Sequence, residues 1–219
     1  MSIKIPFIAG STGATGRTLT KIAEMNNIEI FPHVRRKSAS KVESPETAFD
    51  LSERDLLEKK LSSCYSVVQL IGTMKKRFSS GDTYETSDIG TTRTLVEAAK
   101  SQSVQHIVLL SSVGAGSPRG SYLKAKAEAE RIVRESGISY SIFRPSMFEG
   151  DYHGRIPGFR FLGEKLGLRK YLPIKLEELA GAILLSSISE NSGSTIFEGE
   201  NLWAQVEKAR DAQLVPTLF

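Results

Sequence analysis

A glycine-rich turn near the N-terminus constrains the fold of this chain more than any other feature. The segment IAGSTGATGRTL, residues 8–19, has Gly10, Gly13 and Gly16 at three-residue spacing between an apolar strand-like run and a helical pattern. In turns of this kind, one glycine permits a sharp reversal and a second lets the backbone approach a phosphate. A third lets the helix pack closely against its strand. The spacing therefore indicates a strand, a tight turn and a helix in direct succession.

Free N–H groups at the start of such a helix point toward a ligand and attract negative charge. We therefore predict that the turn binds the pyrophosphate of a dinucleotide, with a plain strand-to-helix connection as the alternative. The predicted loop comprises Gly10, Ser11, Thr12, Gly13, Ala14, Thr15 and Gly16.

Apolar runs and helical patterns alternate along the rest of the chain. Strands are expected after the first one at residues 28–34, 47–49, 66–72, 106–112, 138–145 and 195–198. Helices are expected at 17–26, 52–60, 84–101, 121–136 and 176–189, and Trp203 indicates a further helix near the C-terminus. This alternation predicts an α/β fold with a doubly wound parallel sheet. We expect one domain over residues 1–219, with the irregular segment 148–175 as a small substrate cap.

Composition narrows the class of protein and its partners. A net charge of +4 without a long basic run gives no reason to expect nucleic acid as a partner. No apolar stretch approaches the roughly 18–20 residues that span a bilayer, so no membrane partner is expected. Cys64 is the single cysteine, and we expect a buried thiol in a reducing compartment. The first strand starts too early for a signal peptide, which favours a cytoplasmic location.

The three histidines, His33, His106 and His153, have no metal-ligand spacing with other side chains, so no metal is expected.

The end of the second expected strand carries a basic cluster, Arg35, Arg36 and Lys37. In dinucleotide-binding folds, an acidic residue near this place holds the ribose 2′-hydroxyl of NAD. A guanidinium instead binds a 2′-phosphate through charge-assisted hydrogen bonds. We therefore predict NADP(H) as the cofactor, with Arg35 and Arg36 at its phosphate. A solvated basic turn is the alternative.

A serine, a tyrosine and a lysine are the candidate catalytic residues. Ser112 ends the expected strand 106–112, and Tyr122 and Lys126 follow on the next helix at positions i and i+4, which share one face. An ammonium beside a phenol favours the phenolate, so Tyr122 could exchange a proton with a substrate oxygen. Ser112 would hold the same oxygen, and Lys126 could bind the nicotinamide ribose. An ordinary surface helix rich in Ala, Lys and Glu is the alternative.

Together these motifs resemble the atypical short-chain dehydrogenase/reductases, and within them the NAD(P)-binding group with NmrA-like and Tat-interacting-protein-like members. The resemblance covers about residues 3–200 and includes the glycine triad, Asp50-Leu51, the serine pair, Tyr-x-x-x-Lys and Arg144-Pro145-Ser146. It implies a Rossmann fold, and it implies further cofactor contacts. These are Asp50 and Leu51 at the adenine, Gly72 and Thr73 along the cofactor, and Pro145 at the nicotinamide, in addition to Tyr122 and Lys126.

Two departures from the family pattern affect the expected activity. The strand 66–72 ends in Ile-Gly-Thr instead of Asn-Asn-Ala-Gly, and Asp88 lies in the neighbourhood of the expected catalytic Asn. Several relatives bind NADP(H) chiefly as a sensing ligand.

We therefore hold two functions open. The first is an NADPH-dependent oxidoreductase that reduces a small carbonyl-type or quinone-type substrate. The second is a non-catalytic NADP(H)-binding regulator or assembly factor. A sugar-nucleotide epimerase is a weaker third, because epimerases carry a larger C-terminal domain. The chain is expected to be a monomer or a homodimer.

Overall fold

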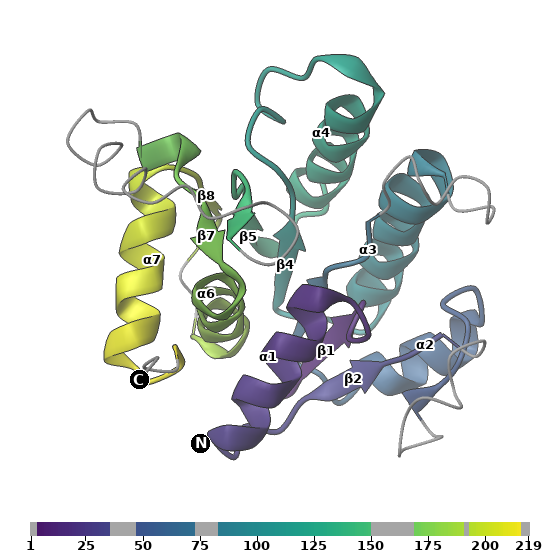
Figure 1. Ribbon diagram of the computed structural model, residues 1–219. Coiled ribbons are helices and arrows are strands. Elements are labelled where there is room, and N and C mark those ends of the chain that lie inside the picture. The colour runs from purple at the N-terminus through teal and green to yellow at the C-terminus, as the bar shows by residue number, and fades with distance from the viewer. Residues whose placement is uncertain (1–3, 36–46, 73–82, 150–168, 191–192, 216–219) are drawn as a thin grey trace.

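Parallel strands form the central sheet in the computed structural model, which describes residues 4–35, 47–72, 83–149, 169–190 and 193–215 (Figure 1). The six strands lie in the order β2-β1-β3-β4-β5-β8. Phe7 of β1 is opposite Phe31 of β2 on one side and Val67 of β3 on the other. The strands are β1 (Pro6–Ala9), β2 (Phe31–His33), β3 (Ser66–Gln69), β4 (His106–Leu110), β5 (Ser139–Phe143) and β8 (Thr195–Phe197).

Helices cover both faces of this sheet, which confirms the doubly wound α/β fold. Because successive side chains of a strand point to opposite faces, Ile8 packs on one side while Phe7 and Ala9 pack on the other. The side of Ile8 is covered by α1 (Ala14–Met25), α6 (Leu176–Ile188) and α7 (Glu200–Asp211). The opposite side is covered by α2 (Arg54–Leu61), α3 (Thr91–Ser101) and α4 (Gly120–Arg134). Trp203 is buried on α7, as expected for a C-terminal helix that packs on the body.

Some element boundaries differ from the expected ones for local reasons. The strand expected at 66–72 ends at Gln69, because the Gln69 side chain accepts the Ile71 N–H at 2.8 Å. The expected strand 28–34 begins only at Phe31, since Ile28 N–H bonds back to Ala23 O. Of the strand expected at 47–49, the structure has a single parallel bridge between Val34 and Ala48. The helix expected at 17–26 already begins at Ala14, directly after Gly13.

The helix expected at 84–101 consists of two parts. Its first part, η4 (Tyr84–Gly90), is π-helical, and α3 continues from Thr91. The Thr91 N–H donates to Thr86 O, five residues back, instead of to the carbonyl four residues back. The sequence pattern shows only helical periodicity and does not distinguish these two windings.

Both ends of the expected cap lie within the described residues. A second small sheet pairs β6 (Phe148–Glu149) with β7 (Ile174–Lys175), and a 3₁₀ turn, η5 (Arg169–Tyr171), precedes β7. Ser146 Oγ donates to Leu172 O at 2.5 Å and ties this sheet to the end of β5. Residues 150–168 of the expected cap lie outside the described residues.

Cys64 is buried as expected, and burial raises the pKa of its thiol to about 11. Within the described ranges, the structure has no helix long and apolar enough to cross a membrane.

Candidate functional site

The glycine turn has the backbone that its spacing predicts. Gly10 follows β1 with a positive φ of 96°, and a Cβ there would lie 3.0 Å from Ile71 N. Gly13 N–H donates to Gly10 O at 3.0 Å, and Gly13 is the N-terminal cap of α1. A Cβ on Gly16 would come within 2.2 Å of Gly10 O, so only glycine fits there. The turn therefore aims the exposed start of α1 at the carboxyl end of the sheet.

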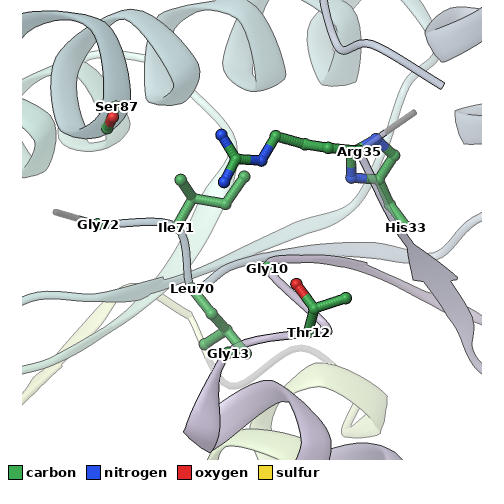
Figure 2. A pocket seen from close by; sticks show the side chains of 9 residues that line it. All are labelled: Gly10, Thr12, Gly13, His33, Arg35, Leu70, Ile71, Gly72 and Ser87. Atoms are coloured by element: carbon green, nitrogen blue, oxygen red, sulfur yellow. The ribbon is translucent and has the colours of Figure 1, made fainter. Parts of the chain in front are cut away.

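A cavity of about 120 Å³ lies over this turn (Figure 2). The strand order reverses between β1 and β3, and ligands of open α/β sheets bind at such a switch point. The volume is below the roughly 300–1,000 Å³ of typical ligand sites, so it suits part of a dinucleotide. The lining residues are Gly10, Thr12, Gly13, His33, Arg35, Leu70, Ile71, Gly72 and Ser87.

Arg35 enters this cavity from the end of β2. Figure 2 shows its side chain extended toward Ile71, with the guanidinium beside the Ile71 side chain. Arg35 is exposed and lines the cavity. Arg36 and Thr73, two further predicted cofactor residues, lie outside the described residues.

His33 was not predicted as a site residue, yet it lines the cavity and bonds to two segments around it. Its Nε2–H donates to Phe49 O at 2.9 Å, and its own carbonyl accepts the Ser11 hydroxyl at 2.6 Å. Burial lowers the pKa of the imidazole, so the ring is neutral near pH 7. His33 thus links the glycine turn to the segment that carries Asp50. Its position directly before Val34 and Arg35 was the available signal.

Asp50 and Leu51 lie beside the cavity without lining it. Asp50 is exposed and its N–H donates to Glu53 Oε1 at 2.8 Å. Leu51 is half-buried and packs against the core between α2, α3 and the sheet. The predicted adenine contact of these two residues therefore stays a prediction. Ser11 and Thr15 are buried in the turn, whereas Thr12 and Ala14 are exposed.

The ammonium of Lys126 is buried where β3 and β4 end. Nζ pairs with Asp88 Oδ1 at 2.9 Å and donates to Leu110 O at 3.2 Å. The Asp88 side chain is only 1% exposed and that of Lys126 9%. A Cβ on Gly72 would come within 3.0 Å of Nζ and 3.2 Å of Oδ1. The charged pair therefore lies directly against Gly72, which also lines the cavity.

Tyr122 lies on the same face of α4 as Lys126, as the i, i+4 spacing predicts. The Lys126 Nζ is 5.9 Å from the centre of the Tyr122 ring. The Tyr122 ring also packs against Tyr84 of η4, with ring centroids 5.8 Å apart. Tyr122 is 36% exposed, so its phenol is accessible.

The two serines at the end of β4 have different environments. Ser111 is buried and donates to Glu130 Oε1 at 2.5 Å. Ser112 is half-buried, and its Oγ is 3.4 Å from Val113 O, which is long for a hydroxyl hydrogen bond. Ser112 is therefore the serine of the pair whose hydroxyl is less committed to the protein.

The Glu130 carboxylate that accepts the Ser111 hydroxyl also forms a buried ion pair with Arg144. Arg144 donates to both carboxylate oxygens of Glu130, through Nε at 2.8 Å and Nη2 at 2.5 Å. This hydrogen bonding raises the pKa of Arg144 above its usual value. Pro145 follows directly and is buried, with its carbonyl accepting the Val113 N–H at 2.9 Å. Glu130 was not predicted, although it lies on the same helix face as Lys126 at i+4.

Among the described residues, no group of three or more His, Cys, Asp and Glu side chains could hold a metal ion. His106 is at the opposite end of β4, where it bonds to Ser139 and Ser141.

Comparison with known proteins identifies the family. Residues 10–174 match the NAD(P)H-binding family. The chain belongs to this family. The resemblance to the atypical short-chain dehydrogenase/reductases is thereby confirmed.

Curated relatives of this NAD(P)H-binding protein include "Protein FMP52, mitochondrial" of Candida albicans, 27% identical over 66% of this chain and 67% of that protein. The divinyl chlorophyllide a 8-vinyl-reductase of Cucumis sativus, named as chloroplastic, is 26% identical over 84% of this chain. The chain spans about half of that reductase, 49% of its length. Because the names of these relatives include mitochondrial and chloroplastic locations, the cytoplasmic location of this chain stays a prediction.

Among solved structures, the oxidoreductase ylbE from Lactococcus lactis matches with a TM-score of 0.67 at 18% identity. The match covers 94% of this chain and 97% of ylbE, and it shows the shared fold.

Proposed function

We propose that this protein is an NADPH-dependent oxidoreductase that reduces a small carbonyl-type or quinone-type substrate. The observation that carries the proposal is the buried ammonium of Lys126, which lies between the Tyr122 ring and Gly72 of the cofactor-side cavity. A lysine beside a phenol at the carboxyl ends of parallel strands is the arrangement that reductive proton transfer needs.

In this proposal, bound NADPH supplies the hydride. Tyr122 donates a proton to the substrate oxygen, and its exposed phenol allows this contact. Ser112 hydrogen-bonds the same oxygen and orients it. Lys126 stabilises the phenolate that remains and binds the nicotinamide ribose through an N–H that the protein has oriented.

The preference for NADPH over NADH rests on Arg35. Its guanidinium extends into the cavity over the glycine turn, where it would meet a 2′-phosphate on the adenine-side ribose (Figure 2). The pyrophosphate would lie against the start of α1, held by the backbone N–H groups after Gly13.

Two measurements test this function. Titration with NADPH and NADH, followed by fluorescence of the nicotinamide, measures binding. NADPH oxidation at 340 nm is then screened with aldehydes, ketones and quinones. NADPH binding together with turnover of one of these classes supports the proposal, and a protein that binds neither cofactor contradicts it.

A second function is favoured by the ion pair between Lys126 and Asp88. Because Asp88 Oδ1 is 2.9 Å from Lys126 Nζ, the negative charge of Asp88 offsets the positive charge of Lys126 that would stabilise a Tyr122 phenolate. A protein that binds NADP(H) without turnover, as a regulator or assembly factor, would tolerate this. Its test is affinity capture with and without NADPH: a partner retained in only one state, with no substrate reduced, favours the regulator.

A further inference from the structure

Helix α4 and the π-helical segment η4 contact each other at two successive levels, and both contacts involve proposed catalytic residues. On α4, Tyr122 and Lys126 are four residues apart, and on η4, Tyr84 and Asp88 have the same spacing. The rings of Tyr84 and Tyr122 pack with centroids 5.8 Å apart. Asp88 Oδ1 is 2.9 Å from Lys126 Nζ. The segment η4 thus contacts both Tyr122 and Lys126, the proposed catalytic tyrosine and lysine.

The π-helical winding determines which side chains of η4 face α4. Closing hydrogen bonds over five residues instead of four rotates the segment relative to the α-helix that follows. Thr91 N–H bonds to Thr86 O in this way, at the junction with α3. An α-helical η4 would turn Tyr84 and Asp88 to other directions. Short π-helical segments occur frequently at functional sites.

The backbone of Asp88 is tied to the strand that lines the cavity. Thr92 Oγ1 donates to Asp88 O at 2.6 Å and accepts from Gln69 Nε2 at 3.2 Å. Gln69 in turn accepts the N–H of Ile71, a cavity residue. Thr92 and Gln69 are both buried. These bonds link the backbone of Asp88 to Gln69 at the end of β3.

The Asp88 carboxylate lies against the ammonium of Lys126. A lysine ammonium has three N–H donors. Leu110 O accepts one of them at 3.2 Å, and the Asp88 carboxylate forms an ion pair with the same ammonium, with Oδ1 2.9 Å from Nζ. The hydrogen bond to Leu110 O and the ion pair with Asp88 together restrict where the ammonium lies. Gly72 leaves room for the pair, because a Cβ there would come within 3.0 Å of Nζ.

We propose that Asp88 and Tyr84 are positioning residues of this site. Asp88 holds the Lys126 ammonium in the orientation that binds the cofactor ribose. Tyr84 packs on Tyr122, so that the phenol of Tyr122 keeps one orientation. This inference rests on the proposed NADPH binding and reduction.

The test for Asp88 is a double-mutant cycle on NADPH affinity. The variants are Asp88→Asn, Lys126→Met and the two combined, with the dissociation constant measured by nicotinamide fluorescence. We expect Asp88→Asn to weaken NADPH binding roughly tenfold, about the worth of one charge-assisted hydrogen bond. In the Lys126→Met background, the same substitution should have no further effect, because Asp88 acts through Lys126. Glu85→Gln is the matched control, since it removes an exposed carboxylate from the same segment.

Each outcome of this cycle decides a separate point. Equal weakening in both backgrounds would show a general structural role and overturn the inference for Asp88. Unchanged NADPH affinity in Asp88→Asn would also overturn it, while NADPH binding by the unmodified protein would keep the proposed function intact. If the unmodified protein does not bind NADPH, the proposed function itself is wrong.

Should Asp88→Asn fail to fold, the double variant, in which neither partner is charged, is compared with Lys126→Met alone. Equal affinities of these two proteins support the inference, and a further weakening in the double variant overturns it.

The test for Tyr84 compares two substitutions. Tyr84→Leu removes the ring and should lower kcat about tenfold, with the dissociation constant of NADPH changed less than twofold. Tyr84→Phe keeps the ring and should recover most of the kcat that Tyr84→Leu loses. Equal kcat in the unmodified protein and Tyr84→Leu, or equal losses in the two variants, would overturn the positioning role of the ring.

Discussion

Ser111 donates its hydroxyl to the buried carboxylate of Glu130 at 2.5 Å, and this contact distinguishes the two adjacent serines that follow β4. The same carboxylate receives two hydrogen bonds from Arg144. Ser111 is therefore part of a buried network with Glu130 and Arg144, whereas Ser112 is half-buried. This difference supports Ser112 as the serine that contacts substrate.

Glu130→Ala should destabilise the protein strongly, because it leaves the Arg144 guanidinium buried without its main partner. Breaking a buried ion pair typically costs about 3–5 kcal/mol in the free energy of unfolding. The control is Glu128→Ala, which breaks a more exposed pair with Arg131 and should cost less than about 1 kcal/mol. Urea unfolding measures both. Similar losses in the two variants would contradict the structural role of Glu130.

NADPH should bind at least tenfold tighter than NADH, a difference of about 1.4 kcal/mol, because Arg35 extends into the cavity where the 2′-phosphate is expected. Arg35→Ala, alone or with Arg36→Ala, should remove most of this preference. Lys59→Ala removes an exposed positive charge from α2 and should leave the preference as it is. Equal titration curves for the two cofactors in the unmodified protein would refute this prediction.

Gly13→Val should weaken cofactor binding while the fold is largely retained. A Cβ at Gly13 would be 3.3 Å from Gly10 O, which small movements can accommodate, but the branched side chain would occupy the expected pyrophosphate site. Gly16→Ala should instead disrupt the turn itself, because its Cβ would lie 2.2 Å from Gly10 O. Circular dichroism and NADPH titration separate these effects. Unchanged NADPH affinity in a folded Gly13→Val protein would place the phosphate site elsewhere.

Tyr122→Phe should lower kcat by about 10²–10⁴-fold while NADPH affinity barely changes, since it removes the proton donor and keeps the ring. Lys126→Met should reduce both kcat and NADPH affinity, because Lys126 is proposed to stabilise the phenolate and bind the ribose. The measurement is steady-state NADPH oxidation with the substrate found by screening. Turnover of Tyr122→Phe at the wild-type rate would mean that the proton comes from another donor.

The free energy of unfolding should fall as the pH drops from about 6.5 toward 4. Burial lowers the pKa of His106 from 6.5 to about 4 in the folded protein. Between these values the unfolded chain binds a proton that the folded protein does not, so acidification favours unfolding. Through His106 alone, the free energy of unfolding should be about 2 kcal/mol lower at pH 5 than at pH 7.5. His33, whose pKa is also lowered, contributes in the same direction.

The check is urea unfolding at pH 7.5 and pH 5.0. His106→Gln retains a side chain that can bond to Ser139 and Ser141 but does not titrate. The difference between the two pH values should shrink by about 2 kcal/mol in this variant. An equal pH difference in both proteins would mean that His106 does not cause it.

Local and periodic signals in the sequence determined the fold. The glycine spacing predicts the turn between β1 and α1, and the alternation of apolar runs with helical patterns predicts the doubly wound sheet. The i, i+4 spacing of Tyr122 and Lys126 placed them on one helix face. These features depend on residues that are close in the chain, so the sequence alone carries them.

Only the tertiary structure decided which distant residues meet. The pairs Asp88–Lys126 and Glu130–Arg144 join residues 38 and 14 positions apart, and the His33 ring bonds to Phe49 O, 16 positions along the chain. The π-helical winding of η4 could not be predicted either, since it depends on packing between that segment, α4 and the end of β3. Through-space contacts of this kind follow from how the elements pack, and side-chain periodicity contains no information about their partners.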